Sequence, residues 1–183
     1  MKAKINVVLI LLFFQFSIVL PQSKQIEAVK QESSITYQLT HLLHEIESTS
    51  KEAYCKIDFD LSKKEIKKVF VQVDVTTFNS GNSNRDSHAM EVIDALSFPD
   101  SRFTSSSITQ KGDSLKVYGK LTFHGITQDI VISAATKWTN NKLVVNGNFD
   151  ISLTAFKVER PSLLFIPCKD ILKFTLDQVF NLM

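Results

Sequence analysis

The sequence predicts an all-β domain in which about eight antiparallel strands are joined by short turns and interrupted by one short helix. From Ile35 onward apolar and polar residues alternate with a period of two, the pattern of strands with one buried face. Turn signals such as Lys111–Ser114 separate these runs, and connections this short join antiparallel neighbours. One segment, Asp86–Leu96, spaces its apolar residues as a helix does.

The strand runs are regular along most of the chain. A short run opens the domain at Ile35–His41, and the clearest runs are Ala53–Asp60, Val69–Val75, Leu115–Phe123, Leu143–Ile151 and Leu172–Phe180. This pattern is typical of a sandwich or of a closed barrel. Closure removes the exposed strand edges that an open sheet would leave. An eight-stranded barrel is either filled by its own side chains or holds one small ligand, and periodicity does not choose between these outcomes.

The helix has plausible boundary residues in the sequence. Asp86 or Ser87 is predicted to cap its start, and Pro99 follows shortly after its end. It falls after the third strand or so in the predicted order.

The chain is predicted to begin with a cleaved signal peptide over residues 1–22, followed by a linker over 23–32 and the domain over 33–183. Lys2 and Lys4 precede the apolar run Ile5–Leu20, which is the pattern of a secretory signal. A membrane-spanning helix needs roughly 20 apolar residues, and this run is shorter and interrupted by polar residues. We therefore expect a periplasmic or secreted protein with no stable membrane insertion after cleavage.

The charge balance excludes bulk attraction to polyanions. The chain has 21 Lys+Arg and 19 Asp+Glu, and both charges of the predicted leader are lysines, so the remainder is formally neutral. A neutral domain has no bulk attraction for nucleic acid or anionic lipid. The basic run Lys63–Lys68 offers a contact with anionic membrane lipid as one interpretation, and a solvated hairpin is favoured because Glu65 interrupts the run and the domain is neutral.

Four segments, taken in order, resemble the YceI-like family. Ser80–His88 contains Arg-Asp-x-His before the helix, and Phe98–Ser105 resembles the family's Pro…Phe-x-Ser strand start. Gly119–Thr127 is similar to its G-x-L-T-x-x-G-x-T hairpin. Phe149–Arg160 is similar to a late strand that ends in Phe-Gly, although Lys157 stands where glycine is usual. The opening strand departs from the family pattern, so the lumen mouth is less well defined by the resemblance.

The resemblance implies a lipocalin-like extended barrel that binds a polyisoprenoid or similar apolar lipid in its lumen without catalysis. Burial of each CH₂ group contributes roughly 0.8 kcal/mol, so an apolar lumen binds such a chain without reactive groups. The residues expected to point inward and contact the ligand are Ile57, Phe59, Val71, Val73, Phe103, Leu121, Phe123, Ile132, Phe149, Phe174 and Leu176.

Two residues at the helix start, Arg85 and His88, are candidates for a mouth that receives a polar headgroup. The alternative interpretation is structural: Arg85 and Asp86 fix the loop by pairing and capping. Glu159–Pro161 is interpreted as a structural plug or ion pair.

Three alternatives remain open at this stage. The barrel could be a ligand-free interaction module filled by its own side chains, and a homodimer is not excluded. A metal-dependent enzyme would require His41, His44, His88 or His124 to converge with a carboxylate such as Glu45. No cofactor, metal or catalytic residue is predicted, since G-x-S-x-G and H-E-x-x-H motifs are absent.

Cys55 and Cys168 are interpreted as two separate buried thiols, although export would permit a disulfide.

Overall fold

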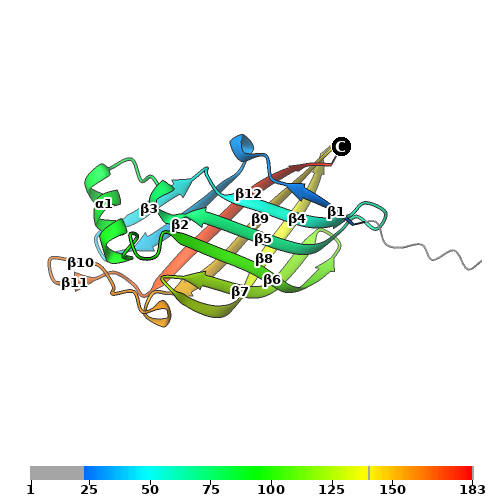
Figure 1. The fold of residues 1–183 in the computed structure, drawn as a ribbon. Coiled ribbons are helices and arrows are strands. Elements are labelled where there is room, and N and C mark those ends of the chain that lie inside the picture. Colours follow the sequence, from blue (N-terminus) through cyan, green and yellow to red (C-terminus); the bar gives the residue numbers. More distant parts are fainter. Residues whose placement is uncertain (1–22, 140, 183) are drawn as a thin grey trace, which may run out of the picture.

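The computed structural model describes residues 23–139 and 141–182; the predicted signal peptide lies outside them. Ten strands of the described chain form one curled antiparallel sheet, and one α-helix crosses one end of it (Figure 1). The elements in chain order are β1 (Ser23–Glu27), η1 (Lys30–Glu32), β2 (Ser34–Thr40), β3 (Glu45–Ser50), β4 (Tyr54–Asp60), β5 (Glu65–Asp74), η2 (Val75–Thr77), α1 (Ser83–Val92), β6 (Asp100–Lys111), β7 (Ser114–Phe123), β8 (Ile126–Thr139), β9 (Lys142–Ser152), η3 (Thr154–Phe156), β10 (Ser162–Leu163), β11 (Ile166–Pro167) and β12 (Ile171–Asn181).

The predicted all-β barrel class with one inserted helix is confirmed, but the predicted number of strands was too low. The sheet order is β1-β4-β5-β6-β7-β8-β9-β12-β2-β3, and β10 and β11 form a separate small hairpin. The difference arises in the N-terminal third. Residues 23–27, predicted as a linker, pair with β4, and the opening run continues through a turn into β3.

The helix starts earlier than the sequence predicted. Helix α1 begins at Ser83, and Asn82 is the N-cap, because its side-chain oxygen accepts a hydrogen bond from Arg85 N at 3.1 Å. The predicted caps Asp86 and Ser87 lie within the first turns instead. Asp86 is used differently, since its carboxylate accepts from the backbone N and the hydroxyl of Ser80.

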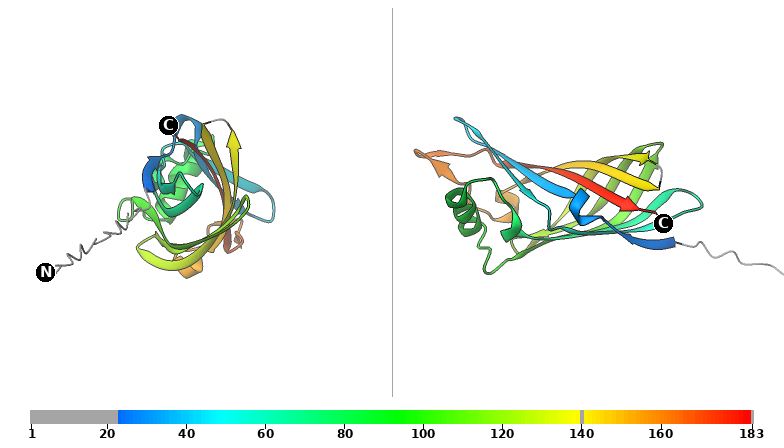
Figure 2. Two further views of the ribbon diagram at one scale, coloured as in Figure 1. Left: turned by 90° about the vertical axis from the view of Figure 1, so that its right-hand side faces the viewer. Right: turned by 90° about the horizontal axis from the view of Figure 1, so that it is seen from above.

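The N-terminal segment closes the curled sheet at two places. At the end that carries the termini, Ala28 bridges Phe180 of β12 while β1 pairs with β4. At the α1 end, Thr49 of β3 bridges Asn79, which follows β5 and η2. The view along the barrel shows the strands curling around a common axis (Figure 2, left). Closure in this way satisfies sheet edges that would otherwise be open.

The half of the barrel near the termini is filled by packed side chains. Phe59 packs on Trp138 with ring centroids 5.6 Å apart, and Leu143 and Phe180 are almost completely buried beside them. The free space that remains in this half is about 50 Å³, lined by residues such as Ile57, Leu115 and Phe180. This base therefore behaves as an ordinary hydrophobic core.

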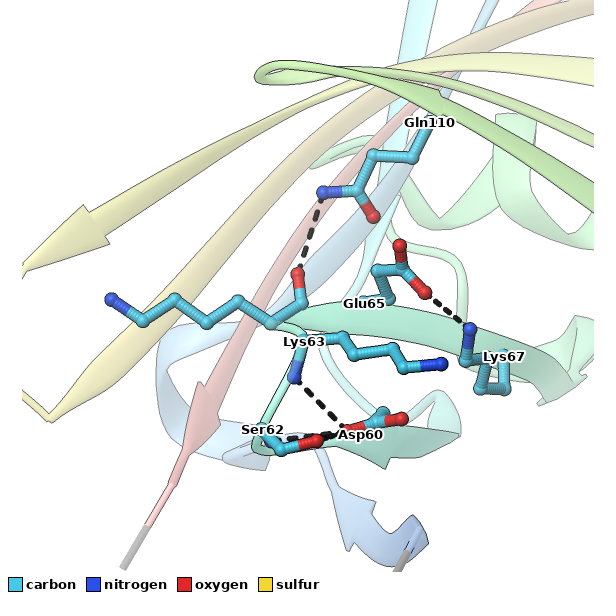
Figure 3. Close-up of polar contacts among 7 residues, drawn as sticks. Asp60, Ser62, Lys63, Glu65, Lys67 and Gln110 are labelled. Carbon is cyan, nitrogen blue, oxygen red and sulfur yellow. Dashed lines mark hydrogen bonds and ion pairs between the residues drawn. The ribbon is translucent and has the colours of Figure 1, made fainter. Parts of the chain in front are cut away.

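The β4–β5 hairpin at this end is held by Asp60. One oxygen of its carboxylate accepts from the Ser62 hydroxyl at 2.6 Å and from the backbone N of Ser62 and Lys63 (Figure 3). These bonds, with the Ser62 hydroxyl as the largest cause, lower the pKa of Asp60 below its ordinary value. Lys67 and Glu65 form an ion pair on the same hairpin, as expected for a solvated basic turn.

Both cysteines are buried free thiols, as the sequence interpretation favoured. Burial raises the pKa of Cys55 to about 12, so this thiol is not reactive in the folded protein.

None of the helices in the described part of the chain has the length and apolar content needed to cross a bilayer.

Candidate functional site

The half of the barrel beneath α1 is hollow. A cavity of about 160 Å³ lies there, enclosed by inward-facing residues from the wall strands and by one face of the helix. The wall contributes apolar side chains at alternate positions of each strand, as the period of two requires. The lining comes from Ile35, Tyr37, Leu39, Ile46, Val71, Val73, Val75, Phe78, Ser101, Phe103, Leu121, Phe123, Ile132, Phe149, Ile151, Leu153, Val158, Pro161, Leu172, Phe174 and Leu176, and from the helix residues named below.

Aromatic rings shape one wall of this cavity. Phe149 of β9 and Phe174 of β12 are cross-strand partners that stack with centroids 4.8 Å apart and an interplanar angle of 4°. Tyr37 of β2 meets Phe174 edge-on at 6.3 Å and Phe78 at 5.3 Å. Burial, the largest cause, raises the pKa of the Tyr37 phenol. The wall therefore offers flat, rigid apolar surfaces with a neutral hydroxyl among them.

Helix α1 covers the cavity with partly buried residues, Met90 and Val92, that pack against the edge of the core. Its residues Ala89, Met90, Val92 and Ile93 face the cavity, yet none of the ten residues of α1 is buried. An element that buries so little apolar surface opens at low free-energy cost compared with a core strand. The cavity is thus closed by an element that has no fully buried residue.

The polar residues at the mouth are already engaged by the protein. Arg85 donates from Nε to Ser80 Oγ and from Nη2 to Ser80 O, both at 2.8 Å. Because Asp86 also binds Ser80, that serine connects the guanidinium and the carboxylate. His88 has a largely exposed side chain with Nδ1 3.6 Å from Glu91. The loop-fixing interpretation accounts for these contacts of Arg85, and a headgroup role for Arg85 and His88 stays a prediction.

The structure places most of the predicted ligand-contacting residues together. The nine that line the cavity are Val71, Val73, Phe103, Leu121, Phe123, Ile132, Phe149, Phe174 and Leu176, with Arg85 and His88 at its mouth. Ile57 and Phe59 point inward as well, but they lie in the filled base and outside this cavity. Alternation identifies the inward face of a strand, whereas position along the barrel axis decides between cavity and core.

Several lining residues were missed by the sequence analysis. Ile35, Tyr37 and Leu39 alternate along β2 and were visible as a strand signal, but the short opening run was not assigned to the lumen. Met90 and Ile93 were read as the apolar side of a helix, without indication of what that side covers. Phe78 carries no sequence signal, because it follows a 3₁₀ turn.

The rings of His41 and His44 lie 5.3 Å apart, but among the described residues the four histidines do not gather with a carboxylate into a metal site. His41 is buried, with Nε2 2.9 Å from Ile166 O, and His124 Nδ1 lies 3.0 Å from Phe156 O. Over residues 23–139 and 141–182 no three His, Cys, Asp or Glu side chains are grouped as metal ligands. The His contacts are those of structural side chains that fix turns.

The fold and cavity together define a class: a single-domain antiparallel barrel with an apolar lumen beneath a lid helix. Comparison with known proteins assigns the family, since the family model described as a YceI-like domain matches residues 27–179. The chain belongs to the YceI-like family. It is 26% identical over 141 residues to a UPF0312 protein of Pseudomonas savastanoi, covering 72% of this chain and 73% of that one. It is 28% identical over 127 residues to protein YceI of Salmonella newport, covering 68% and 66%.

Solved structures share the fold. BcnA of Burkholderia cenocepacia superposes with a TM-score of 0.75 at 20% identity, covering 83% of this chain and 98% of that one. A Campylobacter jejuni YceI protein gives 0.68 at 24% identity over 78% and 88%. A polyisoprenoid-binding domain from Saccharophagus degradans gives 0.65 at 7% identity over 87% and 99%. At these identities the likeness concerns the fold.

Proposed function

We propose that this protein binds the apolar chain of an isoprenoid or similar lipid in the cavity beneath α1 and catalyses no reaction on it. The observation that carries the proposal is the composition of the cavity wall, which is mostly apolar and aromatic, with charged residues only at the mouth. Such a wall removes hydrocarbon from water at roughly 25 cal/mol per Å². The polyisoprenoid-binding domain of S. degradans, which shares the fold, supports the ligand class.

The size of the cavity defines how a long ligand is accommodated. About 160 Å³ is close to the volume of an engineered cavity that holds one benzene, so it encloses a short apolar segment as it stands. A polyprenyl chain requires α1 to move outward or the rest of the chain to leave through the mouth. The exposed, loosely packed α1 is suited to that movement. The competing function, a ligand-free interaction module, would require no such space and no such lid.

Export is part of the proposal. The basic and apolar start of the chain is a signal pattern, and a lipid carrier outside the cytoplasm would meet membrane lipids directly. Recovery of the protein from a periplasmic or culture fraction, with an N-terminus downstream of the apolar run, tests this part.

The substitution Ala89→Trp tests the binding site. Ala89 faces the cavity from α1, and an indole side chain placed there occupies much of the space. We expect the affinity for a fluorescent polyprenyl probe to fall by at least about tenfold, because the ligand must displace a buried aromatic group. Probe fluorescence titration measures it, together with mass spectrometry of lipids extracted from the purified protein.

Ala135→Trp is the matched control, since Ala135 is exposed on the outer face of β8. Its affinity should equal that of the unsubstituted protein. Equal binding by Ala89→Trp, or a native protein that repeatedly carries no lipid and takes up no probe, would refute the proposed function.

A further inference from the structure

Two hairpins project side by side beyond the α1 end of the barrel and expose apolar side chains at their tips (Figure 2, right). Phe165 is 99% exposed, Leu42 77% and Leu164 72%. The hairpins are joined, since His41 Nε2 lies 2.9 Å from Ile166 O and Lys169 N donates to Thr40 O at 2.8 Å. We call the exposed residues of both tips, Leu42, Leu43, Leu163, Leu164, Phe165 and Ile166, the apolar tips.

The β10–β11 turn does not have the residues that its backbone favours. Leu164 and Phe165 form the two-residue loop with φ of 52° and 66°, the positive values of a type I′ turn. Such turns favour Asn-Gly, and bulky apolar residues at positive φ are strained. Neither side chain compensates by packing, since both are exposed. Folding of the hairpin therefore does not explain why apolar residues occupy it.

The β10–β11 hairpin is uncharged up to Arg160 and Lys169, the charged residues nearest its tip, with Glu159 and Asp170 one residue further from the tip on either side. Residues 161–168 contain no Asp, Glu, Lys or Arg, whereas Arg160 and Lys169 flank the base on either side of the pair formed by Cys168 N and Pro161 O. At about 3.3 Å per residue, both cations lie roughly 13 Å behind the tip. Apolar groups insert about 5–10 Å at the headgroup boundary, and long cationic side chains reach the phosphates from there.

We propose that the apolar tips dock the barrel reversibly on an anionic lipid bilayer, with Arg160 and Lys169 at the phosphate layer. The inference rests on the proposed function, because docking serves the transfer of a lipid into the cavity. The two hairpins adjoin that cavity, since Pro161 at the base of one and Leu39 and Ile46 of the other line it. A docked barrel has its mouth against the membrane. An apolar chain then moves between bilayer and lumen without crossing water.

The test is flotation with protein-free vesicles of 70% phosphatidylethanolamine and 30% phosphatidylglycerol. The double variant L164N/F165G supplies the residues that the turn prefers, so its Tm should equal or exceed that of the unsubstituted protein. Its vesicle binding should weaken by at least about tenfold, because two inserted apolar side chains are lost. Leu61→Ser is the matched control, since Leu61 is an exposed leucine in the β4–β5 turn at the opposite end.

The cations are tested separately. R160S/K169S should bind phosphatidylglycerol vesicles roughly 30-fold more weakly, because each cation near an anionic surface contributes about 1 kcal/mol. K63S/K64S on the opposite hairpin should bind as the unsubstituted protein does. Loss of binding in K63S/K64S together with normal binding by L164N/F165G would place the membrane contact at the other end and overturn the inference.

Lipid uptake separates this inference from the proposed function. A polyprenyl probe added from ethanol should bind L164N/F165G normally, whereas transfer of the same probe from vesicles should slow. If the unsubstituted protein binds the probe added from ethanol but binds no vesicles, the docking inference is overturned and the proposed function stands. The apolar tips would then contact another protein. A protein that binds vesicles but no probe loses the proposed function and retains the docking.

Discussion

At the scale of single residues, Gly119 of β7 leaves no room for a side chain against β6. A Cβ atom built there would lie 2.4 Å from Thr104 O and 2.5 Å from the ring of Phe103, which lines the cavity. We expect Gly119→Ala to lower the free energy of unfolding by about 1–3 kcal/mol, because the backbone and a buried ring must shift. Urea denaturation measures this loss.

Gly147→Ala provides the comparison on the same sheet. Its nearest neighbour would be a methyl group of Ile132 at 3.3 Å, which can yield by a small side-chain movement. The destabilisation should be clearly smaller than for Gly119→Ala, and equal losses in both variants would contradict the steric explanation.

Asp60 makes stability depend on pH in acid. Its pKa is lowered in the folded protein, so the carboxylate stabilises the fold fully above its unfolded pKa, near 3.9, and this stabilisation is lost as pH falls through the folded pKa. Asp60→Asn should have a lower urea midpoint than the unsubstituted protein at pH 7, and the gap should close in strong acid. Asp129→Asn, at an exposed position of β8, should show no such closure.

Residue identity was predictable where one physical requirement dominates. Alternation was enough to place Phe149 and Phe174 on the inward face, and the structure stacks them. The unusual Lys157 was noticed only by resemblance. The structure gives it a φ of 57°, the left-handed conformation that glycine adopts without strain, which explains why glycine is usual there.

At the scale of elements, the lid helix depends on its N-cap. Asn82→Ala removes the acceptor for Arg85 N and should destabilise α1 by about 1 kcal/mol. Because α1 buries no residue, Tm should change little while the α1 amides exchange faster and vesicle-free probe uptake accelerates. Asn84→Ala, two residues after the cap in the first turn, should leave the exchange rates nearly unchanged. A large fall in Tm for Asn82→Ala would contradict the view of α1 as a loosely held lid.

The regular strands were predictable from the sequence and the N-terminal elements were not. Runs such as Leu115–Phe123 carry their burial pattern locally, and β7 reproduces it with every second residue buried. Ser23–Glu27 has one buried residue, Ile26, so its strand exists because β4 offers a partner edge. Pairing partners distant in sequence leave no periodic signal in a polar segment.

At the scale of the whole molecule, the division into a filled base and a hollow half could not be read from the sequence. Ile57 and Val73 occupy equivalent alternating positions, yet one borders the base and the other the cavity. What distinguishes them is the side-chain volume that the opposite wall supplies, which depends on the closure of the sheet. The cavity itself was therefore an expectation that rested on the family resemblance.

The closure of the sheet at two points affects the width of ligand that the cavity could admit. Near the mouth, β3 is attached across the gap by backbone hydrogen bonds of 3.1 and 3.0 Å between Thr49 and Asn79, and by the side chains of Ser50 and Thr77, whose hydroxyl oxygens lie 2.6 Å apart. If that attachment is released, β2 and β3 can move outward. The bridge between Ala28 and Phe180 of β12 keeps the base of the barrel closed. The amides of Thr49 and Asn79 should exchange with deuterium well before those of β7. Their exchange should be faster still when a ligand of large cross-section is bound. Under the proposed function, this closure between β3 and Asn79, rather than the number of strands, limits the width of the ligand.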